Sequence, residues 1–430
     1  SAIERQVQHM VRLVDDLLDV SRISTGKITL RQEPVMLADV VHQAVETSRP
    51  LITERGHHLA LELPDEEVRL YADRTRLSQV ISNLLNNAAK YTDAGGEILG
   101  TAHFNSHTLI AARVLTAASD AAIDAAFIAE RLKAALALRE KLFARPFYRL
   151  VHAEADGLPG LIVDRFDDVF VVQPNTAGMN ALMNEIAAAI GLIAAPKAIV
   201  LRGDSAARGL EGLKEDVRCF SGSLDGPVPV EENGVTYYAD LLSGQKTGWF
   251  FDQRDNHAYV AGLARGASVL DLYTHTGGFA LAAAKAGARE VLGVDSSAHA
   301  LELAAKAARG AAKFERSDVF AFLESAAARK AAWDVVIADP PAFVKSRKDL
   351  QAGLKGYRKL ARLCAAVTAP GGFLFVASCS HNAPLDEFIA AVTRGVSDAG
   401  RQARILRVSG ASADHPVHPA LPESAYLKAV

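Results

Sequence analysis

The stretch SVLDLYTHTGGFALAAAKAGAREVLGVD, residues 268–295, decides the fold class of the C-terminal half of the chain. SVLDLY reads as a buried strand, and the loop at residues 274–278 leads into an alanine-rich helix that begins at Phe279. A second strand, EVLGVD, then ends in Asp295. This order of strand, helix and strand is typical of a parallel, doubly wound α/β sheet.

The same alternation continues to the end of the chain. A third strand ends near Asp318, a fourth is WDVVIADPP and a fifth is GGFLFVASCS. The closing segments ARILRVS and AYLKAV predict an antiparallel pair of strands. We therefore expect a Rossmann-like α/β domain over residues 228–430.

The region before this domain predicts a small α+β domain over residues 119–227. Residues 119–142 are alanine-rich and helical, and a second helix is expected at 178–192. Strand signals lie in YRLVHAEADG, in LPGLIVDRFDDVFVVQ with a turn at Asp167-Asp168, and in KAIVLRGD. VPVEENGVTYYAD predicts a further hairpin, since Asn-Gly is a favoured pair for a tight turn.

Composition limits the class of protein. The 430 residues are 50% hydrophobic and 23% charged, which suits two to four globular domains and excludes collagen-like and disordered chains. No apolar stretch reaches the ~20 residues of a membrane span, and no signal-peptide pattern opens the chain. Three cysteines cannot form a disulfide framework, so a cytoplasmic protein is expected.

The strand ends carry the features of a nucleotide site. Ligands of doubly wound sheets bind outside the carboxyl ends of the strands. Gly277 and Gly278 let the backbone approach a ligand, and Asp295 is placed to accept hydrogen bonds from ribose hydroxyls. NAD is the rival cofactor, but its G-x-G-x-x-G pattern is absent. The pattern D-x-Y-x-x-x-G-G-F, followed by an acidic strand end, fits S-adenosylmethionine better.

The tripeptide Asp339-Pro340-Pro341 ends the fourth strand. In nucleic-acid methyltransferases such a step holds the polar edge of a flipped-out base, and an aromatic ring such as that of Phe343 stacks on the base. These residues alone suit methylation of an amino group or of guanine as well as methylation of cytosine.

Cys379, in the run SCS at the end of the fifth strand, discriminates between these reactions. Carbon 5 of cytosine is a poor nucleophile, and it reacts after a thiolate has added to carbon 6. Cys379 is expected one strand from Asp339 and facing the same pocket, which favours cytosine-5 methylation. The alternative, a guanine RNA methyltransferase, does not need this cysteine. Cys219 and Cys364 are expected to be buried hydrophobic residues.

Residues 100–430 resemble the large-subunit (23S) rRNA cytosine-5 methyltransferases of the RlmI type. The first matching stretch resembles the end of the family's RNA-binding PUA domain, so residues 99–118 are expected to be a remnant of that domain and its linker. The matching stretches, in order, are GTAHFNSHTLIAARVL, GQKTGWFFDQRDNH, DLYTHTGGFA, GVDSS, SDVFAFL, DPPAFVKS, SCS and ADHPVHPALPESAYLK.

The resemblance implies S-adenosylmethionine as cofactor and ribosomal RNA as partner, with Cys379 as the nucleophile and Asp339 as the partner of the base edge. Residues implied to bind the cofactor are Gln253 and Arg254 at the border of the pocket, Asp271 and Gly277 at the methionine end, Asp295 at the ribose, Asp318 at the adenine amine, and Tyr273, Gly278, Phe279, Ser296 and Asp339 in the same stretches. Residues expected to contact the substrate are Pro340, Pro341, Phe343 and Lys345.

Residues 1–98 resemble a different family, the sensor histidine kinases. A helix with a heptad seam is expected at 1–23, a second helix at 37–54, and an asparagine-rich helix at 74–91 is similar to the N box of that family, with Asn87 at its Mg²⁺-binding position. The helix that carries the phosphoacceptor histidine is missing, as are the glycine-rich boxes that hold the nucleotide phosphates. We therefore expect this fragment to be inactive as a kinase.

Two alternatives concern the N-terminal fragment. One is a histidine kinase-like signalling protein in which the helix at 1–23 dimerises, and the seam makes a homodimer an expectation of the sequence. The other is that two segments of separate origin meet at Leu99 and Gly100.

Charge is unevenly distributed along the chain. Residues 1–99 carry 11 Lys and Arg against 15 Asp and Glu, a net charge of −4, whereas the whole chain has a net charge of −3. A basic cluster lies beside DPP in the sequence. It is expected to bind RNA, and the alternative is that it forms the solvent-exposed face of a helix. The cluster consists of Lys345, Arg347, Lys348, Lys355, Arg358, Lys359 and Arg362. The histidines lack zinc-site spacing, so no metal is expected.

Overall fold

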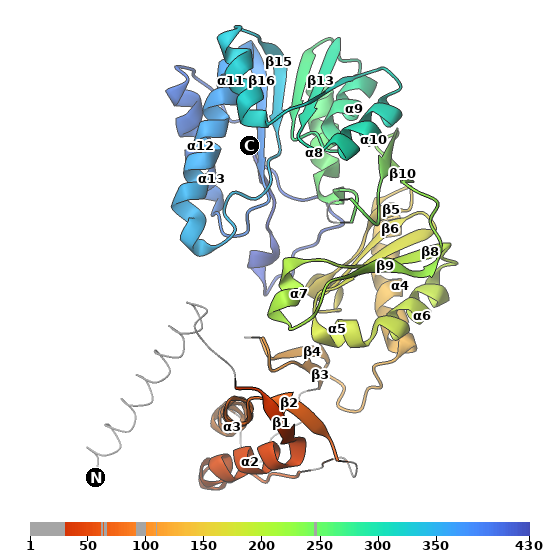
Figure 1. Cartoon of the computed structure of the whole chain (residues 1–430), viewed down its shortest axis with the longest axis vertical. Helices are drawn as coiled ribbons and strands as arrows, with labels where there is room; N and C mark the ends of the chain where they lie inside the picture. The colour runs from red at the N-terminus through yellow and green to blue at the C-terminus, as the bar shows by residue number, and fades with distance from the viewer. Residues whose placement is uncertain (1–30, 62, 64–66, 92–99, 109, 245–246) are drawn as a thin grey trace, which may run out of the picture. The chain divides into compact units, whose positions relative to one another are not determined.

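The computed structural model describes residues 31–61, 63, 67–91, 100–108, 110–244 and 247–430 (Figure 1). The chain divides between Leu99 and Gly100 into two compact units. The helix expected at residues 1–23, with its heptad seam, lies outside the described residues. In the described ranges, no helix combines the length and the apolar character that crossing a bilayer requires.

The first unit consists of two helices and a two-stranded antiparallel sheet. The helices α2 (Leu37–Glu54) and α3 (Arg74–Tyr91) confirm the predicted bounds. They pack against each other, and the Ser48 hydroxyl donates to the Ser82 carbonyl at 3.3 Å. The sheet pairs β1 (Glu33–Met36) with β2 (Arg69–Ala72).

The second unit begins with a hairpin and a long helix. The hairpin pairs β3 (Thr101–Phe104) with β4 (Ala112–Thr116), and the helix α4 spans Ala125–Leu142. The sequence predicts this helix from residue 119. It starts later because Asp124 accepts a hydrogen bond from the Phe127 backbone N–H, which caps the helix at that point.

A five-stranded mixed sheet forms the central domain. Its order is β5-β6-β7-β8-β9, with β7 and β8 parallel and the other pairs antiparallel. The predicted turn at Asp167-Asp168 joins β6 and β7. The helix expected at 178–192 is interrupted at Leu182, whose ψ of 16° leaves helical geometry. The elements are β5 (Phe147–His152), η1 (Ala153–Asp156), β6 (Leu161–Phe166), β7 (Val169–Pro174), α5 (Ala177–Ala181), α6 (Met183–Ile193), β8 (Ala198–Gly203), α7 (Ala206–Leu210) and β9 (Asp216–Gly222).

The predicted hairpin at 228–239 is confirmed. Strands β10 (Val228–Glu232) and β11 (Val235–Ala239) pair in antiparallel register. Asn233 and Gly234 form the turn with φ values of 51° and 75°, the left-handed conformation that a tight hairpin turn requires. The chain then passes through η2 (Phe251–Gln253) into α8 (Arg254–Leu263).

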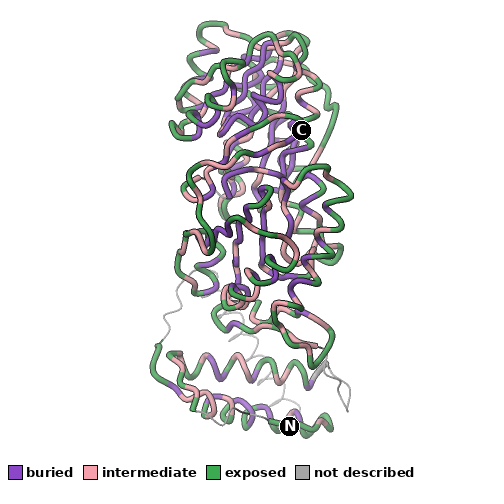
Figure 2. The backbone as a smooth tube through the Cα atoms, turned by 90° about the vertical axis from the view of Figure 1, so that its right-hand side faces the viewer, coloured by how far each residue is buried: buried purple, intermediate pink, exposed green. Residues whose placement is uncertain are grey.

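The C-terminal domain is the predicted α/β sheet with helices on both faces (Figure 1). Its six strands have the order β14-β13-β12-β15-β16-β17, and all pairs are parallel except β16 with β17. Figure 2 shows the buried strands of the sheet inside a partly exposed helical layer. The elements are β12 (Ser268–Leu272), α9 (Gly278–Lys285), β13 (Glu290–Asp295), α10 (Ala298–Ala308), β14 (Lys313–Arg316), α11 (Val319–Ala328), β15 (Trp333–Ala338), η3 (Arg347–Asp349), α12 (Leu350–Val367), β16 (Thr368–Ser378), α13 (Leu385–Asp398), η4 (Pro422–Ser424) and β17 (Lys428–Ala429).

The predicted pairing of ARILRVS with AYLKAV is wrong over most of its length. Residues 401–408 form no strand, and one bridge between Ser409 and Ala429 is all that joins the two segments. Strand β17 spans only two residues, so it offers residues 401–408 little edge to pair with. A groove of about 940 Å³ therefore remains between residues 401–407 and the edge of β16.

Candidate active site

The predicted catalytic residues follow neighbouring strands at the same edge of the sheet. Leu272 at the end of β12 pairs with Ala338 at the end of β15, and Ala338 pairs with Val376 in β16. Asp339 and Cys379 leave these adjacent parallel strands at their carboxyl ends. The structure therefore brings the two side chains predicted for catalysis to one edge of the sheet, beside the loop that follows β12.

The loop between β12 and α9 holds an unusual backbone conformation. Tyr273, His275 and Gly277 have φ values of 61°, 50° and 88°. A Cβ on Gly277 would lie 2.4 Å from the Leu281 side chain, so a larger residue does not fit. Left-handed conformations of ordinary residues are costly and are concentrated at ligand sites. This loop is therefore a strong candidate for close contact with a ligand.

Asp271, at the end of β12, is a buried carboxylate with one unsatisfied oxygen. Its Oδ2 accepts hydrogen bonds from the Thr274 hydroxyl at 2.5 Å and from the Ala280 backbone N–H at 2.9 Å. Its Oδ1 is buried and has no hydrogen-bond partner. Burial raises the pKa of Asp271 to about 7. A buried acceptor of this kind is suited to a cationic or hydrogen-bonding ligand.

Asp295 and Asp318 lie at the ends of the next two strands. Asp295 is half-buried and accepts hydrogen bonds from the backbone N–H groups of His275 at 2.9 Å and of Ser297 at 2.8 Å. Asp318 is exposed and caps α11 by accepting from the Ala321 N–H at 2.9 Å. Ser296 is exposed as well. Each carboxylate keeps further lone pairs with which to accept from a ligand.

Gln253 and Arg254, predicted together at the cofactor pocket, have different surroundings. The Gln253 amide donates to Asp339 Oδ2 at 2.8 Å and accepts from the Asn256 amide at 2.7 Å. Arg254 instead donates to the Phe147 carbonyl of the central domain and lies over the Phe143 ring at 4.6 Å. Gln253 thus orients the Asp339 carboxylate, whereas the contacts of Arg254 join the two domains.

The run SCS is held by a tyrosine of α12. Ser378 donates to the Tyr357 hydroxyl at 2.7 Å, and the hydroxyls of Tyr357 and Ser380 are 2.8 Å apart. Both serines are fully buried, whereas Cys379 between them is half-buried. The Phe343 ring packs on Tyr357 at 4.7 Å, so it supports this loop as well as being predicted to stack on a base.

The remaining predicted residues have varied surroundings. Phe279 is buried in the core and makes an edge-to-face contact with His257 at 4.4 Å. Pro340 is buried, whereas Pro341 and Lys345 are exposed. Cys364 is fully buried, as predicted, but Cys219 is half-buried because β9 lies at the edge of its sheet. In the described part of the chain, no three His, Cys, Asp or Glu residues form a group that could hold a metal ion.

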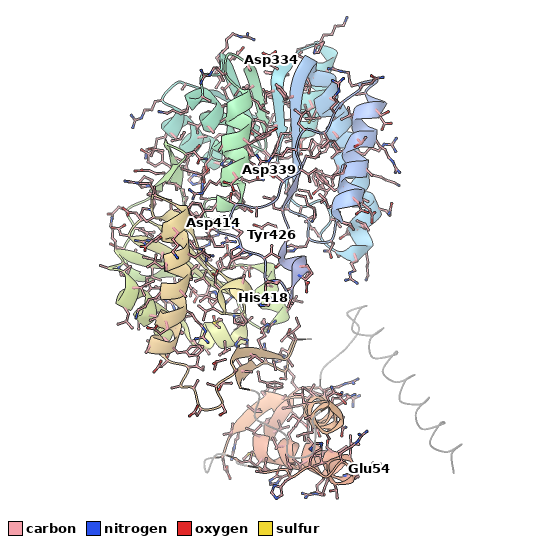
Figure 3. The ribbon with its side chains drawn as sticks, turned by 180° about the vertical axis from the view of Figure 1, so that it is seen from behind. Glu54, Asp334, Asp339, Asp414, His418 and Tyr426 are labelled. Carbon is pink, nitrogen blue, oxygen red and sulfur yellow. The ribbon has the colours of Figure 1, made fainter. Side chains whose placement is uncertain are left out.

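The sequence did not predict a role at this site for Tyr426 and Lys428, which lie in the C-terminal segment beside it. The Tyr426 hydroxyl donates to Asp252, and the Tyr426 ring stacks on His381 at 5.1 Å. Lys428 donates from its ammonium group to the Ser380 carbonyl at 2.9 Å. The stretch ADHPVHPALPESAYLK contains Tyr426 and Lys428 and was the available signal, but its individual residues had no assigned role. Figure 3 shows Asp339, Tyr426 and Asp414 in the region where the two domains meet.

Buried hydrogen bonds of Asp414 fix this C-terminal segment to the central domain. Asp414 accepts from the Arg149 backbone N–H at 2.9 Å, and its carbonyl accepts from the Arg139 guanidinium at 3.1 Å. Arg139 also binds Asp156 in a bidentate pair at 2.5 and 2.7 Å. Burial and the nearby arginines lower the pKa of His152 to about 3, so it is neutral in this cluster.

Comparison with known proteins identifies the family. Residues 213–430 match the family described as S-adenosylmethionine-dependent methyltransferase. The chain is 37% identical over 343 residues to ribosomal RNA large subunit methyltransferase I of Aeromonas salmonicida, with 77% of this chain and 87% of the relative covered. The chain belongs to this family of methyltransferases. The protein of the same name from Photobacterium profundum is 37% identical over 346 residues, covering 78% of this chain and 87% of the relative.

Solved structures show that the methyltransferase shares its fold with other proteins. A putative S-adenosylmethionine-dependent methyltransferase from Streptococcus mutans has a TM-score of 0.67 and 21% identity, and the match covers 79% of this chain and 89% of that chain. A putative methyltransferase complexed with SAH has the same TM-score, identity and coverage. These similarities confirm the α/β methyltransferase fold expected from the sequence.

The described residues fit S-adenosylmethionine as the cofactor of this methyltransferase. The unsatisfied Oδ1 of Asp271 suits a cationic group, and the half-buried Asp295 suits a ribose diol. The left-handed loop between them lets the backbone approach closely. The two carboxylates and the loop therefore agree with S-adenosylmethionine, the cofactor that the family uses.

Proposed function

We propose that this methyltransferase forms 5-methylcytosine in large-subunit (23S) rRNA through a covalent adduct of Cys379. The observation that supports the proposal best is the position of Cys379 and Asp339 at the carboxyl ends of adjacent strands β16 and β15. The relatives that the chain matches over most of its length carry the name ribosomal RNA large subunit methyltransferase I, which favours the same substrate.

The proposed reaction assigns a role to each side chain. The Cys379 thiolate adds to carbon 6 of the cytosine, and a C–S bond forms while the 5,6 double bond opens. Asp339, oriented by Gln253, hydrogen-bonds the base edge, and in its protonated form it donates to ring nitrogen 3, which offsets the negative charge that develops on the ring. Carbon 5 is then nucleophilic. Once carbon 5 carries the methyl group, a water molecule takes its proton, the electron pair re-forms the 5,6 double bond, and the C–S bond breaks to release the thiolate.

S-adenosylmethionine supplies an electrophilic methyl group when bound. We assign its methionine end to Asp271 and Gly277, its ribose to Asp295 and its adenine to Asp318. Tyr273, Gly278 and Ser296 lie in the same loops, and the buried Phe279 acts by packing under them.

The test is a pair of variants assayed on protein-free rRNA. We expect Cys379→Ala to lose methylation by about three orders of magnitude or more, because the thiolate is the nucleophile, while S-adenosylhomocysteine affinity is unchanged. Cys219→Ala is the matched control and keeps wild-type activity. Mass spectrometry of the nucleosides identifies the product. A fully active Cys379→Ala variant would overturn the covalent route, and methylated guanosine as the product would show that the guanine RNA methyltransferase is correct instead.

We assign RNA binding to the basic cluster between residues 345 and 362, in place of the missing part of the PUA domain. The structure reduces the free charge of this cluster, since Arg358 pairs with Asp398 at 2.6 Å and Lys359 with Glu324 at 3.0 Å. The residues that we propose to contact RNA are the exposed Lys345, Arg347 and Lys355. Replacing them by glutamine is expected to weaken RNA binding and its salt dependence.

We assign residues 1–98 to an inactive fragment of a sensor histidine kinase, residues 99–118 to the PUA remnant, residues 119–227 to the central domain and residues 228–430 to the methyltransferase domain. The two helices α2 and α3, with Asn87 exposed on α3, agree with the order of elements in a kinase fragment. ATP binding with micromolar affinity would instead favour a kinase-like signalling protein, and dimerisation through residues 1–23 is tested by the mass of the full chain in solution.

A further inference from the structure

The ammonium group of Lys428 lies in an unusual environment next to the run SCS. Lys428 is 9% exposed, and strand pairing sets it opposite Ser378. Its Nζ donates to the Ser380 carbonyl at 2.9 Å and to the Tyr426 carbonyl at 3.0 Å. The backbone on both sides of Cys379 is therefore tied to this lysine.

Lys428 is a buried cation without an anionic partner in the described part of the chain. Both of its hydrogen bonds go to neutral carbonyl oxygens, and no carboxylate of the described residues forms an ion pair with it. A buried charge costs several kcal/mol unless an opposite charge compensates it. Burial lowers the pKa of Lys428, whereas a thiolate at Cys379 raises it. The thiolate is thus an anion that the site itself can supply.

Two further titratable groups that interact electrostatically with Cys379 are tyrosine hydroxyls. A charge on Cys379 raises the pKa of Tyr357, which lies on α12, and of Tyr426, which precedes β17. Burial raises the pKa of both tyrosines, so they are neutral at physiological pH. His381 stacks on Tyr426 from the loop that follows Cys379. Of Tyr357, Tyr426 and Lys428, only Lys428 carries a positive charge when it is protonated.

We infer that Lys428 is a positioning residue, which holds its ammonium group beside the sulfur of Cys379 and stabilises the thiolate form. The inference rests on the proposed function, since it concerns the nucleophile of that reaction. A cation next to a cysteine favours the thiolate, which is the form that attacks the base. The two carbonyl hydrogen bonds keep the ammonium group in place, so the stabilisation exists before RNA binds.

The experiment measures the ionisation of Cys379 in the full-length protein. Iodoacetamide alkylation is followed between pH 5 and 10, and peptide mass spectrometry separates Cys379 from the other two cysteines. In the wild type we expect the midpoint below the ~8.5 of a free cysteine. Lys428→Met is expected to raise the midpoint by about one pH unit or more, and Lys428→Arg to keep most of the effect.

Two further variants keep the test decisive. Lys428→Gln can still donate hydrogen bonds without the charge, and it covers the case in which Lys428→Met does not fold. Lys306→Met is the matched control, because Lys306 lies on α10 over the Tyr238 ring, at 4.1 Å, and should leave the midpoint unchanged. A folded Lys428→Gln or Lys428→Met protein with a wild-type midpoint would overturn the inference.

Methylation assays separate this inference from the proposed function. If Lys428 acts through the thiolate, the acidic limb of the kcat profile moves to higher pH in Lys428→Gln, and activity recovers partly in alkaline buffer. An equal loss at every pH would indicate a purely structural role and contradict the inference. An active Cys379→Ala variant would overturn the proposed function, whatever the alkylation midpoint shows.

Discussion

At the scale of single residues, the site contains a carboxylate, that of Asp271, whose ionisation depends on burial. Asp271 is almost completely buried, and only one of its oxygens has hydrogen-bond donors. Its raised pKa means that the protonated form favours folding. This contribution is fully present below pH ~3.8 and is lost as the pH rises through about 7. Binding of a cationic ligand reverses the preference, because it needs the ionised carboxylate.

The affinity for S-adenosylmethionine is therefore expected to depend on pH through Asp271. Affinity should rise by up to about tenfold per pH unit below pH 7 and level off above it, since the carboxylate ionises in this range. Asp271→Asn should weaken binding and remove most of this dependence. Isothermal titration calorimetry between pH 5.5 and 8.5 checks both points.

The matched control is Asp255→Asn, which changes an exposed carboxylate of the nearby helix α8. This variant should keep the pH profile of the wild type. An unchanged profile in Asp271→Asn would mean that a different group controls cofactor affinity.

At the scale of elements, the catalytic loop depends on a helix that carries no catalytic residue. The Tyr357 hydroxyl of α12 is the hydrogen-bond partner of two fully buried serine hydroxyls, one on each side of Cys379. Helix α12 thus helps to set the position of Cys379, the proposed nucleophile, from one face of the sheet, while β16 leads the chain into it.

Tyr357→Phe is expected to destabilise this loop. The variant removes a hydroxyl shared by two buried serines, at a cost of about 1–3 kcal/mol, which corresponds to roughly 2–10 °C in Tm. Differential scanning fluorimetry measures the shift, and kcat should fall because Cys379 is less well held. Tyr259→Phe is the control, since the Tyr259 ring contacts Arg407 through its face. A wild-type Tm and kcat in Tyr357→Phe would show that the serines hold the loop without the tyrosine.

At the scale of the whole molecule, a buried arginine of the central domain joins an ion pair of that domain to the C-terminal segment of the methyltransferase domain. Arg139 is fully buried, binds Asp156 through two hydrogen bonds and also donates to the Asp414 carbonyl. Removing one member of a buried pair leaves the other charge uncompensated, which is more costly than losing an exposed pair.

Arg139→Met is accordingly expected to destabilise the protein by about 3–5 kcal/mol. Arg145→Met, which breaks the exposed pair with Glu231, should cost at most about 1 kcal/mol. Thermal unfolding of the two variants under the same conditions gives the comparison. Similar Tm values for both would contradict the structural role that we give to the buried pair.

The N-terminal unit is expected to be dispensable for the reaction. Residues 1–99 have a net charge of −4, which disfavours contact with RNA. A protein that lacks these residues should bind S-adenosylhomocysteine as the full chain does, and should bind rRNA equally well or better. Filter binding at several salt concentrations measures the RNA affinity. A clear loss of affinity on deletion would show that this unit has become a substrate-binding domain.

The amino-acid sequence by itself determined most local elements of this protein. Helices α2 and α3 have the predicted bounds because their apolar residues recur at helical spacing, and the Asn233-Gly234 turn follows from backbone preferences of two residues. The parallel strands β12, β13, β15 and β16 were visible as largely apolar runs that end near a polar residue, whereas β14 (KFER) is mostly exposed and carries no such run. The edge strand β9 was not, because its residues are mostly exposed and show no clean alternation.

The tertiary structure alone decided which side chains meet. Gln253 and Asp339 are 86 residues apart in the chain, Asp252 and Tyr426 are 174 apart, and Ser380 and Lys428 are 48 apart. Local propensity carries no information on such pairs, since they form when strand order and the packing of the C-terminal segment bring distant residues together. The sequence therefore pointed to Cys379 as the proposed nucleophile and to the strand ends, whereas packing supplied the amide that orients Asp339 and the lysine that bonds to the Ser380 carbonyl.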